Sequence, residues 1–221
     1  MQIQDVKPKK GRPKKVQPEA EVKAKKPKTA KEIETIEKFK AVEEIGRNIV
    51  TTATFKEEAR HDWNSEADVC QYIGSLINMI QAKAVLEIGV FEGETSIKMI
   101  EALKTGGYYA GLDINDYRKH KLQKHGVAVD FKLGESIGLL KGFPANHFDF
   151  IFVDGDHSWA NILPEFKEVE RVLAIGGILA YHDTIHIEDV KKLMQYAAHY
   201  KYNVITLNTS EGRGLSILQR S

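Results

Sequence analysis

The sequence has a single cysteine, Cys70, among its 221 residues. One thiol excludes a disulfide within the chain, and we therefore expect a protein of the reducing cytoplasm. No run of apolar residues approaches the roughly 20 that a membrane span needs, so we expect no membrane association. The early lysines precede no apolar segment, and we expect no secretory signal. The 42% of apolar residues are enough for the core of a globular domain.

Proline is also scarce, and four of the six prolines lie in residues 1–30. Residues 1–31 carry eleven Lys or Arg against three acidic residues, a net charge of +8. The other residues, with 21 basic and 28 acidic side chains, carry −7. A segment so poor in large apolar side chains does not offset its ordering entropy, and residues 1–30 are predicted to be a disordered basic tail.

Residues 31–60 are predicted to form an N-terminal helical extension. Their apolar residues recur at a spacing of three, which is typical of a helix: Ile33, Ile36, Phe39, Val42 and Ile45. This helix would pack on its own domain or on a partner subunit, and the pattern leaves the oligomeric state open.

Residues 61–221 alternate between strand and helix patterns, which predicts an α/β domain with a mostly parallel sheet and helices on both faces. Ser65 is placed to cap the first of these helices. The expected helices are 65–82, 95–104, 116–124, 136–140, 159–173 and 187–199. The expected strands are 84–88, 108–112, 128–131, 148–153, 178–181, 204–207 and 215–219, seven in all.

The most informative segment is the loop after the strand 84–88. Its spacing is Glu87-x-Gly89-x-x-x-Gly93, and the next strand ends at Asp113. Glycines let a backbone approach a nucleoside, and a carboxylate at the next strand end accepts hydrogen bonds from ribose hydroxyls. Glu87 and Glu92 would repel a pyrophosphate, whereas they suit a cationic ligand. The loop therefore favours S-adenosylmethionine (SAM) over a dinucleotide, although glycine in an ordinary strand-to-helix turn remains an alternative.

Four segments, in order, resemble motifs of the class I SAM-dependent methyltransferases. Residues 87–93 are similar to motif I, and residues 112–115 to the acidic strand end that binds ribose. Residues 148–158 resemble the D-G-D-H-S signature of a small O-methyltransferase-like group. Residues 174–184 resemble its P-G-G-x-L-x-x-H-D segment, with Ala-Ile in place of Lys-Pro. The resemblance implies a Rossmann-like seven-stranded sheet with an antiparallel strand in the C-terminal hairpin, and an enzyme that methylates a hydroxyl of a small molecule or sugar.

The resemblance also implies roles for individual residues. The methionine end of SAM would lie on Glu87, Gly89, Phe91 and Gly93, and the ribose on Asp113. The adenine would be edged by Glu135 and Ser136, which are alternatively a simple helix N-cap. Asp154 would lie near the sulfonium and the acceptor.

Carboxylates and imidazoles gather around Asp154 in the predicted fold, because His157, His182 and Asp183 also follow strand ends. Two chemistries stay open for them. Asp154, His182 and Asp183 could hold a divalent cation, Mg²⁺ or Mn²⁺, that lowers the pKa of the acceptor hydroxyl. His182 stands where related enzymes have an acid, and imidazole is a poorer Mg²⁺ ligand. Without metal, His157 or His182 would be the general base, unless His157 only caps the next helix.

Residues 7–15 contain a Gly-Arg-Pro core like that of an AT-hook, which reads the minor groove of DNA. A lysine-rich solubilising tail explains the same residues. Two alternatives to the methyltransferase therefore stand: a nucleic-acid-associated protein that uses this tail for weak contact, and a SAM-binding domain without catalysis. The chain lacks the Asn/Asp-Pro-Pro-aromatic tetrapeptide of amino-directed DNA methyltransferases, which argues against base methylation.

Overall fold

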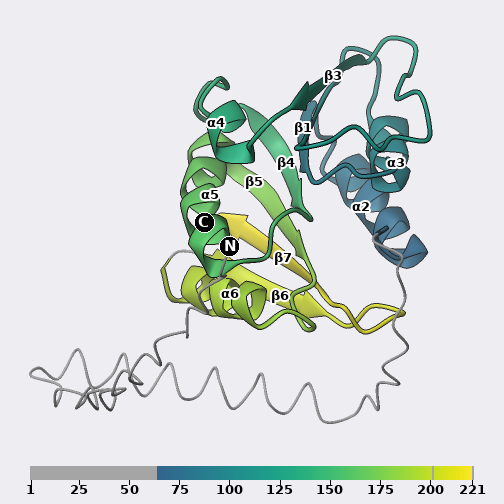
Figure 1. Ribbon diagram of the computed structural model, residues 1–221. Coiled ribbons are helices and arrows are strands. Elements are labelled where there is room, and N and C mark those ends of the chain that lie inside the picture. Colours follow the sequence, from purple (N-terminus) through teal and green to yellow (C-terminus); the bar gives the residue numbers. More distant parts are fainter. Residues whose placement is uncertain (1–63, 201, 221) are drawn as a thin grey trace, which may run out of the picture. The chain divides into compact units, whose positions relative to one another are not determined.

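The computed structural model describes residues 64–200 and 202–220 of the chain (Figure 1). The predicted basic tail 1–30, the helical extension 31–60 and the nucleic-acid segment 7–15 lie outside the described residues and stay predictions. Within the described residues, no helix has the length and apolar character that a membrane crossing requires.

The centre of the domain is one seven-stranded sheet with the strand order β3-β2-β1-β4-β5-β7-β6. Pairing is parallel from β3 to β5, whereas β7 runs antiparallel to both β5 and β6. The predicted sheet and its antiparallel hairpin strand are thus confirmed. The strands are β1 Ala84–Ile88, β2 Tyr108–Asp113, β3 Ala128–Leu133, β4 Phe148–Val153, β5 Leu173–His182, β6 Tyr202–Leu207 and β7 Leu215–Arg220.

Helices cover both faces of this sheet (Figure 1). One face packs on α2 and α3, and the other packs on α4, α5 and α6. Successive side chains of a strand point to opposite faces of the sheet. Val85 therefore packs on the side of α2 and α3, whereas Leu86 packs on the side of α4, α5 and α6. The helices are α2 Ala67–Met79, α3 Glu94–Ala102, α4 Ser136–Leu140, α5 Trp159–Val172 and α6 Glu188–Tyr200.

The strand order reverses between β1 and β4, because β2 and β3 lie on one side of β1 and the later strands lie on the side of β4. Ligands of open α/β sheets bind beyond the carboxyl ends of the strands at such a switch point. Gly89 follows β1 and Asp154 follows β4. The fold therefore places the two principal motifs of the sequence next to each other.

Two local predictions are wrong. The expected helix 116–124 is a loop, because the segment has only Tyr117 and Leu122 as large apolar residues and Leu122 alone is buried. The loop is fixed instead by polar contacts: Lys119 donates its backbone N–H to the Glu92 carbonyl, and Arg118 pairs with Asp116.

Ser65 does not cap α2. The N-cap residue is Glu66, and no side chain caps the helix. The Ser65 hydroxyl donates a hydrogen bond to Asp154 Oδ2 instead, over 2.7 Å. The start of α2 is therefore tied to the carboxyl end of β4, and this contact brings residues of α2 into the candidate site.

Candidate active site at the strand ends

The loop between β1 and α3 passes unusually close to β4. A Cβ atom on Gly89 would lie 2.2 Å from the carbonyl oxygen of Asp154, and the φ of Gly89 is +86°. Only glycine combines this backbone conformation with this proximity. Gly93 ends the loop with φ +92° as the N-cap of α3. The first N–H groups of α3 thus face the space beyond the strand ends.

Asp113, at the end of β2, holds this loop in place. Its Oδ2 accepts the backbone N–H groups of Val90 and Phe91, at 2.9 and 2.8 Å, and its Oδ1 accepts that of Asn115. Phe91 has φ +45°, and its ring lies 5.8 Å from that of Tyr117. A carboxylate oxygen has room for a second donor, so the ribose role predicted for Asp113 is compatible with its role in the loop.

Glu87 points into the core between the sheet and α3 and is 1% exposed. Its Oε2 accepts hydrogen bonds from the hydroxyls of Ser96 and Tyr109. Burial raises the pKa of Glu87 to about 8, against the lowering effect of those two hydrogen bonds. The structure thus brings Glu87 under the loop rather than onto its open side, and a direct contact between Glu87 and methionine stays a prediction.

Glu135 and Ser136 begin α4, as the third strand-end motif. Glu135 occupies the N-cap position of α4, but its side chain makes no capping hydrogen bond. The alternative that this pair is a simple N-cap therefore describes the position of Glu135 and not a role of its side chain. The Ser136 hydroxyl donates to Glu165 of α5, a buried carboxyl that the sequence analysis missed. Burial raises the pKa of Glu165 to about 7. Ser136 therefore faces the core, whereas the Glu135 side chain is exposed at this edge.

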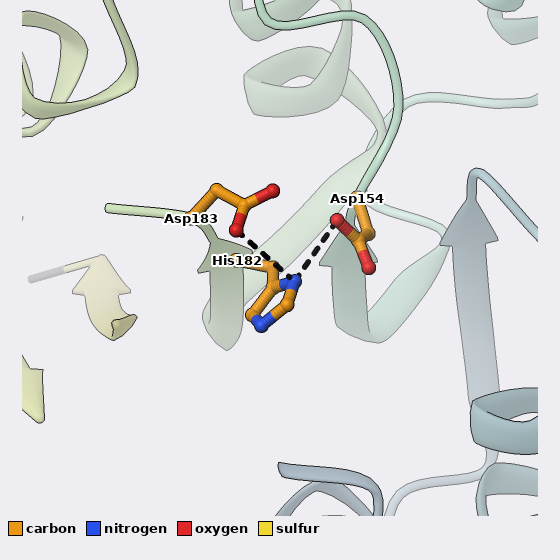
Figure 2. Close-up of side chains that lie close together, drawn as sticks. All are labelled: Asp154, His182 and Asp183. Carbon is orange, nitrogen blue, oxygen red and sulfur yellow. Dashed lines mark hydrogen bonds and ion pairs between the residues drawn. The ribbon is translucent and has the colours of Figure 1, made fainter. Parts of the chain in front are cut away.

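Asp154, His182 and Asp183 converge from the ends of β4 and β5 (Figure 2). His182 Nδ1 lies 3.0 Å from Asp154 Oδ1 and 3.8 Å from Asp183 Oδ1. His157, on the loop after β4, places its Nε2 3.4 Å from Asp183 Oδ2 and 3.9 Å from Asp154 Oδ1. The structure thus brings together all four residues that the sequence analysis assigned to catalysis or metal binding.

Residues beyond these four complete the cluster. Glu66 Oε2 lies 2.5 Å from His182 Nε2, on the far side of the ring from Asp154. Arg213, from the turn between β6 and β7, forks onto Asp183, with Nε 2.7 Å from Oδ1 and Nη2 3.1 Å from Oδ2. No local motif marks Glu66, since it lies 116 positions from its partner. For Arg213, the sequence offered one signal, a charged residue between two glycines in a predicted turn.

The charges of the cluster follow from these contacts. Burial lowers the pKa of His182, but the charge of Asp154 and the hydrogen bonds to Asp154 and Glu66 outweigh it, and the pKa rises to about 10. Burial raises the pKa of Asp154, but the charge of His182 together with the hydrogen bonds from His182 and Ser65 outweighs burial and lowers it. The pKa of Glu66 falls to about 2 for the same reason. Asp154, His182 and Glu66 are therefore charged at neutral pH.

Asp154, His182 and Asp183 each offer one ligand atom, and these atoms lie within 4.8 Å of one another. The cluster is thus a candidate metal centre by composition. Its contacts fit Mg²⁺ poorly, however, because Arg213 takes both oxygens of Asp183 and His182 meets a carboxylate at each ring nitrogen. A protonated imidazole has no lone pair for a metal. The three candidate ligands of the predicted cation are therefore already hydrogen-bonded to protein side chains.

Comparisons with known proteins agree on one family. The model of a family described as O-methyltransferase matches residues 36–217. A caffeoyl-CoA O-methyltransferase of Pinus taeda is 32% identical over 169 residues, which are 68% of this chain and 64% of that enzyme. Caffeoyl-CoA O-methyltransferase 1 of Eucalyptus globulus is 32% identical over 168 residues, 68% of each chain. The match thus spans about two thirds of these relatives.

Solved structures show the same fold. The O-methyltransferase TomG of Streptomyces achromogenes, in complex with SAM, superposes with a TM-score of 0.64 at 18% identity, over 84% of this chain and 98% of that one. An O-methyltransferase of Bacillus cereus, in complex with SAH, gives 0.57 at 15% identity, over 89% and 93%. At these identities the likeness establishes the fold.

Proposed function

This chain belongs to the O-methyltransferase family of class I SAM-dependent enzymes, and we propose that it moves a methyl group from SAM to a hydroxyl of a small molecule. One observation carries the proposal within the structure. Three features lie at the carboxyl ends of neighbouring strands, beside the switch point between β1 and β4. They are the glycine loop after β1, Asp113 at the end of β2, and the charged cluster around Asp154 after β4.

SAM fits the electrostatics of this edge. Glu92 and Asp113 place carboxylates beside the loop, which oppose a pyrophosphate and favour an amino group and a sulfonium. Glu87 lies buried beneath the loop with a raised pKa and adds little charge at neutral pH. We assign the methionine end to the loop segment of Gly89, Phe91 and Gly93, as the family resemblance implies. Asp113 Oδ1, which accepts only the N–H of Asn115, would take a ribose hydroxyl with its second lone pair, and Glu135 would border the adenine.

The two histidines divide their roles by their surroundings. His182 is enclosed between Glu66 and Asp154, which hold a proton on it, so it does not serve as a base. The His157 side chain is 32% exposed as a whole, whereas its Nε2 atom is buried and has no hydrogen-bond partner among the described residues. His157 is therefore the general base of this proposal, and Asp154 orients the acceptor toward the sulfonium.

Methyl transfer is an in-line displacement at the methyl carbon, in which the acceptor oxygen forms a bond as the carbon–sulfur bond breaks. The protein contributes alignment and the removal of one proton. In this geometry the hydroxyl proton passes to His157 Nε2, and Asp183, 3.4 Å away, stabilises the imidazolium that forms. S-adenosylhomocysteine (SAH) leaves from the loop side.

The names of the relatives support a hydroxyl acceptor on a small molecule. The acceptor pocket of this fold is built by helices and loops that vary between enzymes. In this chain the start of α2 and the turn before β7 approach the cluster, through Glu66 and Arg213. These two segments are therefore where we expect acceptor specificity to reside.

Calorimetric titration with SAH tests the cofactor site. The full chain is expected to bind SAH, and Asp113→Asn to bind it at least about tenfold more weakly, since a charge-assisted hydrogen bond is worth about 1.5–3 kcal/mol. Asp130→Asn is the matched control: this carboxylate, on neighbouring β3, pairs with Lys132 away from the loop and should leave SAH binding unchanged. Equal losses in both variants, or binding of NADH in place of SAH, would contradict the proposal.

A further inference from the structure

Arg213 gives the candidate site a fixed positive charge. Its guanidinium takes both oxygens of Asp183, and its Nη1 donates to the carbonyl of Asn64 over 2.8 Å. The Asp183 side chain is only 4% exposed. Because a guanidinium is charged at every relevant pH, Asp183 is always paired with a cation of its own protein.

His182 brings a second positive charge. Its ring is fully buried, and each ring nitrogen faces a carboxylate oxygen, Asp154 at 3.0 Å and Glu66 at 2.5 Å. A neutral imidazole donates from one nitrogen only, whereas an imidazolium donates from both. Ser65 and Thr209 donate to the remaining oxygens of the same two carboxylates. Each acidic group of the cluster thus has its partners within the chain.

The charge count distinguishes two ligands. Glu66, Asp154 and Asp183 carry three negative charges, and His182 and Arg213 carry two positive ones, which leaves −1. One sulfonium brings this sum to zero. A divalent cation added to the sulfonium would raise it to +2 within a few ångströms of a guanidinium, and like charges at such distances repel strongly in a buried site.

We propose that Arg213 and His182 take the place of a divalent cation at the acceptor end of this site, so that the chain transfers methyl groups without added metal. The inference rests on the proposed function, because it assumes that the sulfonium lies beside Asp154. Arg213 acts here as a positioning residue: it holds Asp183 beside His157 and supplies the charge that orders the acceptor side.

Titration of the full chain with MnCl2, followed by the electron paramagnetic resonance of free Mn²⁺, tests this inference. The wild-type chain and Asp154→Asn are expected to bind Mn²⁺ equally weakly. The double variant H182D/R213Q removes both cations and restores an acidic pair, and it should bind Mn²⁺ at least about tenfold more tightly than wild type, a difference of about 1.4 kcal/mol. Adding D154N to this variant should remove the gain.

The matched control is Arg118→Gln. Arg118 forks onto Asp116 as Arg213 does onto Asp183, with two contacts of 2.7 Å, but in the loop after β2. Its loss should not increase Mn²⁺ binding. Tight Mn²⁺ binding by wild type that Asp154→Asn abolishes would overturn the inference, whether or not H182D/R213Q folds. SAH calorimetry on the same samples distinguishes failure of this inference from failure of the proposed function. If wild type does not bind SAH, that result contradicts only the proposed function.

Discussion

Glu165 should make the stability of this protein depend on pH in an unusual direction. The carboxyl is buried on α5, receives the hydroxyl of Ser136 on one oxygen, and has no hydrogen-bond partner on the other among the described residues. Burial raises its pKa from 4.5 to about 7. Glu165→Gln keeps the shape of the side chain and an oxygen for Ser136, and it removes the ionisation.

The magnitude follows from linkage between protonation and folding. The folded chain holds the proton more tightly than the unfolded chain, so wild-type stability is lost as pH rises from about 4.5 through about 7. At about 1.4 kcal/mol for each tenfold change in proton affinity, the rise from 4.5 to about 7 corresponds to about 3 kcal/mol. Glu165→Gln should therefore gain up to about 3 kcal/mol relative to wild type between pH of about 4.5 and 8.

Urea unfolding of wild type and Glu165→Gln, followed by circular dichroism at several pH values, measures this difference. The buried amide of the variant adds a cost that is the same at each pH, so the change with pH is the informative quantity. Glu188→Gln, on the 84% exposed side chain at the start of α6, is the matched control and should show no such change. A difference between wild type and Glu165→Gln that stays constant from acid to alkaline pH would show that the pKa of Glu165 is not raised by folding.

Two further predictions concern the loop and the base. Gly89→Ala should lower the free energy of unfolding by more than about 1–2 kcal/mol. The alanine would have to adopt the left-handed backbone conformation, and its Cβ would also clash with the Asp154 carbonyl. Thermal melts check this against Gly138→Ala in α4, whose Cβ meets nothing within 4 Å and which should melt no lower than wild type; equal behaviour of the two variants would contradict the close approach. His157→Gln should retain SAH affinity and lose about 10²–10⁴-fold in methyl transfer from radiolabelled SAM to a hydroxyl acceptor, and full turnover by this variant would remove His157 from the mechanism.

The sequence predicts the fold well because its signals are local. Buried strands read as short apolar runs, and the loop glycines stand at fixed distances from β1. The alternation of strands and helices then restricts the order of the sheet. The prediction of a helix at 116–124 was wrong. Leu122 is the one buried large apolar side chain of this segment, and polar contacts hold it as a loop, which the residue spacing did not show.

The candidate site was predictable only in part. Asp154, His157, His182 and Asp183 follow strand ends, so parallel topology brings them to one edge. Glu66 and Arg213 reach the same cluster from α2 and from a turn, over 116 and 30 positions. These pairings depend on tertiary packing, which no local pattern reports. Glu66 and Arg213 were for this reason absent from the sequence analysis.

A crystal structure of the chain with SAH would show whether the cofactor binds at the strand ends beside the switch point. We expect the ribose at Asp113, the loop of Gly89 beside the methionine end, and the sulfur facing Asp154 at the end of β4. SAH bound elsewhere on the domain, or crystals that never take up SAH at saturating concentration, would contradict it.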